Sequence, residues 1–326
     1  MKKVYLLLLL TILTLGLLVG CGSTTDDTEQ TANSNDNNTE QTEDTEEASF
    51  PVTITDGTGE KQTIEQKPER IVSVLPSNTE IAFELGLGNK IVGVSKHDNY
   101  PKEVQDIEKV GGLELNIEKI IALKPDLVLA DPSNNQKVLD QLRNAGIPVL
   151  LTGAATDFQG VYDNINLIGK ATGAVSEAED VITGMKDKLA KLKEKANAIK
   201  EDERKTAFIE ISPAPDIYTA GKNTFMAKLL EIIHADNAAS EMEGWAKVNQ
   251  EAIIAKTPDV IITTYGHFVD KPRKKVLSRE GWENVAAVKN KQVINVHTDL
   301  VSRPGPRLVK GVEELGKAIY PDVFGN

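Results

Sequence analysis

From residue 50 onward, short apolar runs alternate with amphipathic stretches. Runs such as 91–94 and 126–130 are rich in aliphatic and β-branched residues, which is typical of buried strands. Stretches such as 78–85 and 136–144 have helical spacing, and a glycine follows each within two residues. This alternation predicts an α/β fold with mostly parallel sheets covered on both faces.

The same pattern extends over the rest of the chain. Residues 52–64 alternate around Asp56-Gly57, which predicts a β-hairpin, and 157–171 closes the first α/β region. The remaining predicted strands are 70–75, 147–151, 206–211, 259–264 and 292–296, and the remaining predicted helices are 224–233, 271–277 and 307–319.

A fourteen-residue pattern occurs twice, at 116–129 and 249–262, with seven identical positions at a fixed separation of 133 residues. Each copy begins with an asparagine suited to an N-cap and places a glutamate, Glu118 or Glu251, in the first helical turn. The separation is too long for a solenoid repeat. We therefore expect two similar α/β lobes with a ligand cleft between them.

The longest helical pattern in the chain falls between the two copies. A capping box at 176–179 opens it, and it continues through a lysine-rich stretch to about Lys200, or about 36 Å at 1.5 Å per residue. We expect a rigid linking helix with only Gly184 as a weak point, and hence a small lobe rotation on ligand binding. The predicted boundaries are 50–175 for the N-terminal lobe, 176–204 for the linking helix and 205–326 for the C-terminal lobe.

The first twenty residues have the pattern of a signal peptide. Lys2 and Lys3 precede an almost wholly apolar run, and small residues lead to Cys21 in the manner of a bacterial lipobox. We expect Cys21 to be the lipidated first residue of a mature protein anchored on the outer side of the cell membrane. It is the only cysteine, so an internal disulfide is excluded and stability must come from core burial.

The segment that follows, 21–49, is predicted to be a disordered acidic tether, because it has nine acidic residues, no basic residue and no aromatic residue. From residue 50 onward the net charge is only −5, without a basic stripe. This charge distribution argues against a nucleic-acid partner.

Signatures of catalysis are absent from the sequence. It has no Gly-x-Ser-x-Gly elbow, no phosphate-binding Gly-x-x-x-x-Gly-Lys and no His-Glu-x-x-His, and its four histidines lie far apart. We therefore expect a binding protein without a cofactor or a bound metal of its own, rather than an exported α/β enzyme.

Several motifs together resemble the substrate-binding proteins of ABC importers for cobalamin and iron–siderophores, and are most similar to the cobalamin binders. Their order and spacing extend the resemblance over nearly all of the chain from residue 50. The motifs are Pro-Glu-Arg-Ile-Val-Ser at 68–73, 77–87, Val-Gly-Val-Ser at 92–95, Tyr-Pro at 100–101, both repeat copies, and Ser-Arg-Pro-Gly-Pro-Arg at 302–307.

The resemblance implies two Rossmann-like lobes joined by one long helix. It also implies a monomer that captures a small ligand and docks on a dimeric ABC permease with its ATPase. In the family, one glutamate on each lobe pairs with arginines of the permease, and the matching positions are Glu118 and Glu251. A carboxylate in the first turn of a helix is stabilised in its ionised form, which suits such a pairing. Each glutamate could instead do no more than cap its own helix.

Five positions match residues that cradle a corrin in the cobalamin binders. They are His97, Tyr218, Trp245, Asp299 and Arg303. The match is incomplete, because His97 replaces a tyrosine, Gly112 and Asp131 replace tryptophans, and Leu300 replaces another aromatic residue. The resemblance thus implies cobalamin as the ligand and leaves an iron(III)–siderophore or haem as the alternative. A siderophore would depend on Arg303, Arg307 and Tyr218.

Overall fold

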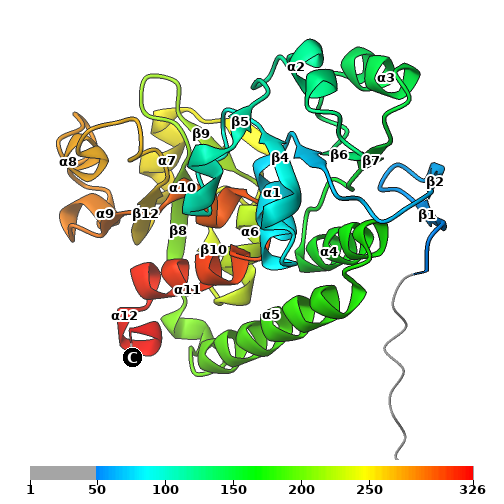
Figure 1. The fold of residues 1–326 in the computed structure, drawn as a ribbon. Helices are drawn as coiled ribbons and strands as arrows, with labels where there is room; N and C mark the ends of the chain where they lie inside the picture. Colours follow the sequence, from blue (N-terminus) through cyan, green and yellow to red (C-terminus); the bar gives the residue numbers. More distant parts are fainter. Residues whose placement is uncertain (1–48, 326) are drawn as a thin grey trace, which may run out of the picture. The chain divides into compact units, whose positions relative to one another are not determined.

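The computed structural model describes residues 49–325 (Figure 1). The predicted signal peptide, the predicted lipidation site Cys21 and nearly all of the predicted tether lie outside the described residues. Among the helices within 49–325, none has both the length and the apolar character needed to cross a bilayer.

The N-terminal lobe contains a five-stranded parallel sheet of order β5-β4-β3-β6-β7. Alternate residues of one strand enter different cores: Leu127 and Leu129 face α1 and α4, whereas Val128 and Ala130 face α2 and α3. Burial on both faces explains the continuous apolar runs. The elements are β3 (Ile71–Ser73), α1 (Pro76–Glu84), β4 (Ile91–Val94), β5 (Glu108–Lys109), α2 (Ile117–Ala122), β6 (Leu127–Ala130), α3 (Gln136–Asn144), β7 (Val149–Leu151) and α4 (Phe158–Thr172).

The predicted hairpin is confirmed as β1 (Val52–Thr55) and β2 (Lys61–Ile64), which pair antiparallel. The Asp56 carboxylate shapes its turn, because Oδ1 accepts hydrogen bonds from the backbone N–H groups of Thr58 and Glu60 at 2.9 and 3.1 Å.

The C-terminal lobe repeats the architecture with a four-stranded parallel sheet of order β10-β8-β12-β13. It adds a two-stranded antiparallel ribbon, β9 and β11, which the sequence pattern does not predict. The elements are β8 (Thr206–Glu210), β9 (Tyr218–Ala220), α6 (Phe225–Ile232), β10 (Asp236–Asn237), β11 (Trp245–Lys247), α7 (Gln250–Lys256), β12 (Val260–Thr263), α8 (Pro272–Leu277), α9 (Ala286–Lys289), β13 (Val293–Asn295), α10 (Thr298–Ser302), α11 (Leu308–Ile319) and α12 (Pro321–Phe324).

The long helix α5 (Val175–Ala196) joins the two α/β regions and lies beside α4 and α11 (Figure 1). The predicted capping box at 176–179 was wrong, because the N-cap is Ala174, which makes no side-chain hydrogen bond. Gly173 ends α4 with a left-handed φ of 70°, so α5 starts at once and Ser176 already lies inside it.

The apolar face of α5 belongs to a core that the two lobes share. Ile182, Met185 and Leu189 are buried in one cluster with the inner faces of both sheets, whereas the outer face of each sheet has a cluster of its own. Since a buried leucine contributes about 2 kcal/mol, this shared core holds the lobes together beyond the covalent link.

Replacing either of two glycines in these helices by alanine should change the free energy of unfolding, and the two changes should have opposite signs. A Cβ at Gly169 would lie 2.7 Å from Ala178 Cβ and 2.9 Å from the Ala174 carbonyl oxygen, so Gly169→Ala forces α4 from α5 and should cost about 1–3 kcal/mol. A Cβ at Gly184 meets nothing within 4 Å, and Gly184→Ala should add about 0.5–1 kcal/mol. Urea unfolding measures both. Equal effects would contradict the close packing of α4 on α5.

Candidate functional site

Loops at the carboxyl ends of the strands bring predicted ligand residues of the two lobes together. Arg303 follows α10 in the C-terminal lobe, and His97 and Asn99 follow β4 in the N-terminal lobe. Arg303 Nη1 donates to Asn99 Oδ1 at 2.7 Å, and Arg303 Nη2 donates to the His97 carbonyl oxygen at 3.1 Å. Asn99 Nδ2 in turn donates to Asp299 Oδ2 at 2.9 Å. Three of the five predicted ligand residues thus lie at one contact between the lobes.

A buried carboxylate lies behind this contact. The Glu80 side chain on α1 is 1% exposed, and its Oε1 accepts from Arg303 Nη1 at 3.0 Å and from Arg307 Nη2 at 2.6 Å. Its Oε2 accepts from Arg307 Nε at 2.8 Å. Arg303 also pairs with Asp299 at 3.2 Å. We call Glu80, Asp299, Arg303 and Arg307 the inter-lobe cluster.

The inter-lobe cluster contains two carboxylates and two guanidinium groups, so its formal charges sum to zero. Burial opposes the charge on Arg307, but the hydrogen bonds and the charge of Glu80 outweigh it and raise the pKa of this guanidinium above its ordinary value. The Arg307 guanidinium also stacks on the Tyr100 ring, 3.8 Å from its centroid. Both arginines are therefore held in fixed positions by groups of the opposite lobe.

The two predicted aromatic ligand residues lie on the ribbon of β9 and β11. The register pairs Trp245 with Ala220 and Lys247 with Tyr218, which places Trp245 and Tyr218 as diagonal neighbours on one face. Trp245 is 55% exposed and Tyr218 is 41% exposed. The ribbon thus presents an uncovered aromatic surface, which we call the aromatic ribbon.

His97 itself has an exposed side chain, which lies beside Gly112. A Cβ at Gly112 would lie 3.0 Å from His97 Nε2, so the lack of a side chain at Gly112 leaves room for this imidazole. Leu113 in the same loop is 91% exposed, and Phe268 after β12 is 63% exposed. Neither apolar side chain belongs to the predicted ligand set, although both lie in loops that follow strands.

Glu118 and Glu251 occupy equivalent places in the two lobes. The expected N-caps are confirmed: Asn116 Oδ1 accepts from the Lys119 N–H, and Asn249 Oδ1 accepts from the Glu251 N–H, both at 2.9 Å. Both glutamates are exposed, and neither has an ion-pair partner among the residues that the structure describes. Their carboxylates are therefore free to meet a cation from outside.

A second buried carboxylate, Glu210, differs from Glu80 because all its partners lie in one lobe. Arg279 donates to its two oxygens at 2.9 and 2.8 Å, and the Tyr265 hydroxyl donates a short hydrogen bond to it. Burial, and then the charge of Glu210, raise the pKa of Tyr265. The lobes therefore each bury one glutamate with arginine, but only Glu80 receives its arginines from the other lobe.

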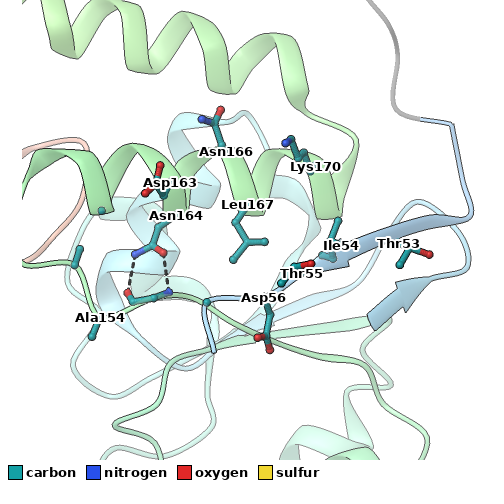
Figure 2. A pocket seen from close by; sticks show the side chains of 14 residues that line it. Thr53, Ile54, Thr55, Asp56, Ala154, Asp163, Asn164, Asn166, Leu167 and Lys170 are labelled. Atoms are coloured by element: carbon teal, nitrogen blue, oxygen red, sulfur yellow. Dashed lines mark hydrogen bonds between the residues drawn. The ribbon is translucent and has the colours of Figure 1, made fainter. Parts of the chain in front are cut away.

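The groove in Figure 2 lies away from these residues. It has a volume of about 710 Å³ and lies between α4 and the strand β1, with Asp163, Asn166 and Lys170 on one side and Thr53 and Thr55 on the other. None of the predicted ligand residues lines it. Within residues 49–325 there is also no group of three or more His, Cys, Asp or Glu side chains placed to hold a metal ion.

The chain is similar in sequence to a family of binding proteins and to individual substrate-binding and cobalamin-binding proteins. Residues 71–300 match a family described as periplasmic binding protein. An uncharacterized ABC transporter substrate-binding lipoprotein, YvrC, of Bacillus subtilis is 50% identical over 278 residues, which cover 84% of this chain and 87% of the relative. A cobalamin-binding protein of Halobacterium salinarum is 30% identical over 282 residues, which cover 83% of this chain and 75% of the relative.

A solved structure supports the same architecture. A possible iron-binding (periplasmic solute-binding) protein from Staphylococcus epidermidis superposes with a TM-score of 0.70 at 37% identity, covering 78% of this chain and 100% of that chain. The expected two-lobed binding-protein fold is thereby confirmed.

One buried acid beside the cluster provides a test of its electrostatics. Asp98 is 5% exposed, and its Oδ2 accepts from Ser95 Oγ at 2.6 Å. Its Oδ1 has no hydrogen-bond partner within residues 49–325. Burial raises its pKa above 3.8 and outweighs the hydrogen bond from Ser95 and the attraction of Lys109 and Arg303. The folded state therefore holds this proton more tightly than the unfolded state, and stability falls as pH rises from about 4 through the folded pKa.

Asp98→Asn removes the charge while keeping the shape of the side chain. We expect the variant to unfold at a higher urea concentration than the wild type at pH 7, with a difference that shrinks toward pH 4. Asp180→Asn, at an exposed position on α5, should change little at either pH. A variant that is less stable than the wild type at pH 7 would show that the ionised carboxylate is well satisfied.

Proposed function

The chain belongs to the periplasmic binding protein family, and from this premise we propose that it captures cobalamin between its two lobes and delivers it to a permease. As an ABC transporter substrate-binding protein it binds a small ligand and works with a permease and an ATPase. Members of this class are solute-binding proteins for transport rather than enzymes.

The proposal of cobalamin as the ligand rests on the zero net charge of the inter-lobe cluster. A ferric siderophore is often anionic, and haem carries two propionates, so either needs cationic partners in the cleft. Arg303 and Arg307 are the arginines expected for that purpose, yet Glu80 and Asp299 pair with them. Cobalamin has a corrin ring with a rim of uncharged amides, and it requires no net positive charge in the site.

The aromatic ribbon supports the same proposal. Trp245 and Tyr218 offer a flat apolar surface whose burial by a large ring system would contribute a large share of the affinity. Leu113 and Phe268 add exposed apolar side chains in loops that follow the strands. A relative named for cobalamin binding, 30% identical over most of the chain, agrees with this ligand.

An iron-containing ligand is the rival. It is supported by the Staphylococcus epidermidis structure described as possibly iron-binding, and by the exposed imidazole of His97, which could coordinate the iron of haem. The same imidazole could coordinate the cobalt of a corrinoid, so His97 does not separate the two ligands.

Calorimetric titration of the purified protein separates them. We expect cyanocobalamin to bind at least about tenfold more tightly than haemin or ferric enterobactin, a difference of about 1.4 kcal/mol. Trp245→Ala should weaken cyanocobalamin binding by about tenfold or more, because an aromatic wall is lost. Because Trp282 is fully buried, a change in tryptophan fluorescence on binding should come from Trp245. This change should therefore disappear in Trp245→Phe. Tighter binding of haemin or the siderophore by the wild type would overturn the proposal.

Docking and anchoring are the remaining parts of the proposed function. We propose that Glu118 and Glu251 pair with arginines of a permease dimer, since equivalent acids on two lobes match a partner with twofold symmetry. We also propose that lipidated Cys21 holds the protein, as a monomer, at the outer side of the membrane.

An uptake assay in cells tests the docking role of the glutamates, and fractionation of the same cells tests the lipid anchor. Reversing both charges in Glu118→Arg/Glu251→Arg should abolish uptake of labelled cyanocobalamin while changing the affinity of the purified protein by less than about twofold. Glu108→Gln, which removes an exposed acid near α2 that already pairs with Lys119, serves as the control and should transport normally.

Cys21→Ser should release the protein from the membrane fraction, whereas the charge-reversed variant stays there. A large loss of ligand affinity on charge reversal would show that the glutamates belong to the ligand site.

A further inference from the structure

We infer that Glu80 determines the charge specificity of the ligand cleft. Its carboxylate holds Arg303 and Arg307 in place and cancels their charge, so that the site disfavours anionic ligands. The inference rests on the proposed function in one respect, which is that the ligand binds between the two lobes beside the inter-lobe cluster. It adds a residue that neither the repeat nor the predicted ligand set contains.

Glu80 acts through the arginines rather than by contact with the ligand. Its side chain is 1% exposed, whereas those of Arg303 and Arg307 are 14% and 17% exposed. The two arginine side chains are therefore partly accessible to solvent, whereas the Glu80 carboxylate that pairs with both of them is not. Such a residue positions the groups that a ligand meets, and its effect on the ligand is electrostatic.

The charge of the cluster depends directly on Glu80. With Glu80 and Asp299 both present the sum is zero, and without Glu80 it becomes +1. At an effective dielectric constant of about 20 and a separation of about 10 Å, one unit charge changes the energy of an anion enough to alter its affinity by about tenfold. A single uncharged substitution should therefore change which ligands the cleft accepts.

The Nη1 and Nη2 groups of Arg303 already have partners within the protein. Nη1 donates to Glu80 and Asn99, and Nη2 donates to the His97 carbonyl oxygen and lies 3.2 Å from Asp299. A ligand carboxylate would have to displace these partners in order to form a bidentate pair with Arg303. Loss of the Glu80 charge weakens one of them and frees hydrogen-bonding capacity for an anionic ligand.

Glu80→Gln tests the inference with three probes, namely cyanocobalamin, haemin and ferric enterobactin, measured by calorimetry. We expect the affinities for haemin and ferric enterobactin to rise about tenfold relative to that for cyanocobalamin, and this gain to shrink at high salt. A merely structural role for Glu80 would weaken the binding of all three probes together and leave their ratios unchanged.

Two further variants separate charge from packing. Glu80→Gln/Arg307→Gln removes one charge of each sign, so the sum returns to zero and the affinity ratios should return toward those of the wild type. Glu210→Gln removes the matched buried glutamate whose partners all lie in the C-terminal lobe. It should lower stability to a similar extent as Glu80→Gln and leave the ratios unchanged.

The outcomes distinguish this inference from the proposed function. The proposed function is decided by which probe the wild type prefers, whereas the role of Glu80 is decided by the change in the ratios between the wild type and Glu80→Gln. Unchanged ratios in Glu80→Gln, or an equal change in Glu210→Gln, would overturn the inference even if the wild type prefers cyanocobalamin. Binding of none of the probes by the wild type would overturn both.

Discussion

The buried carboxylate of Glu80 is the contact on which the relation between the two lobes depends. A carboxylate removed from water must be paired and hydrogen-bonded, and its partners, Arg303 and Arg307, come from the opposite lobe. Loss of either arginine would leave a charge uncompensated. The apolar core around α5 adds non-directional cohesion, whereas this cluster fixes one orientation of the loops at the proposed ligand site.

Under the proposed function, the duplicated helices and the loops between the lobes serve different partners. The features that are alike in the two lobes, an asparagine cap followed by an exposed glutamate, lie on α2 and α7 and suit a symmetric permease. The features that differ between the lobes belong to the proposed ligand site: within residues 49–325 the aromatic ribbon is found in the C-terminal lobe alone, whereas His97 belongs to the N-terminal lobe. A single small molecule has no need of twofold symmetry, so divergence is expected there.

The local features of this fold could be predicted from the sequence, and its long-range features could not. Strand and helix alternation, the hairpin and both asparagine caps depend on neighbouring residues and are confirmed. The start of α5 was misplaced because Gly173 ends α4 so abruptly. The ribbon consists of three-residue strands too short to give a pattern. Glu80 and Arg303 are 223 residues apart, and nothing local to either shows that they meet.

The most direct measurement of the central claim is a crystal structure of the protein with cyanocobalamin bound. We predict a corrin against Trp245 and Tyr218, with Arg303 still hydrogen-bonded to Glu80 and the amide rim in contact with uncharged groups. A corrin bound elsewhere, for example in the groove between α4 and β1, would contradict it. So would an Arg303 that has left Glu80 to bind the ligand, because the site would then supply the positive charge that the cluster is said to cancel.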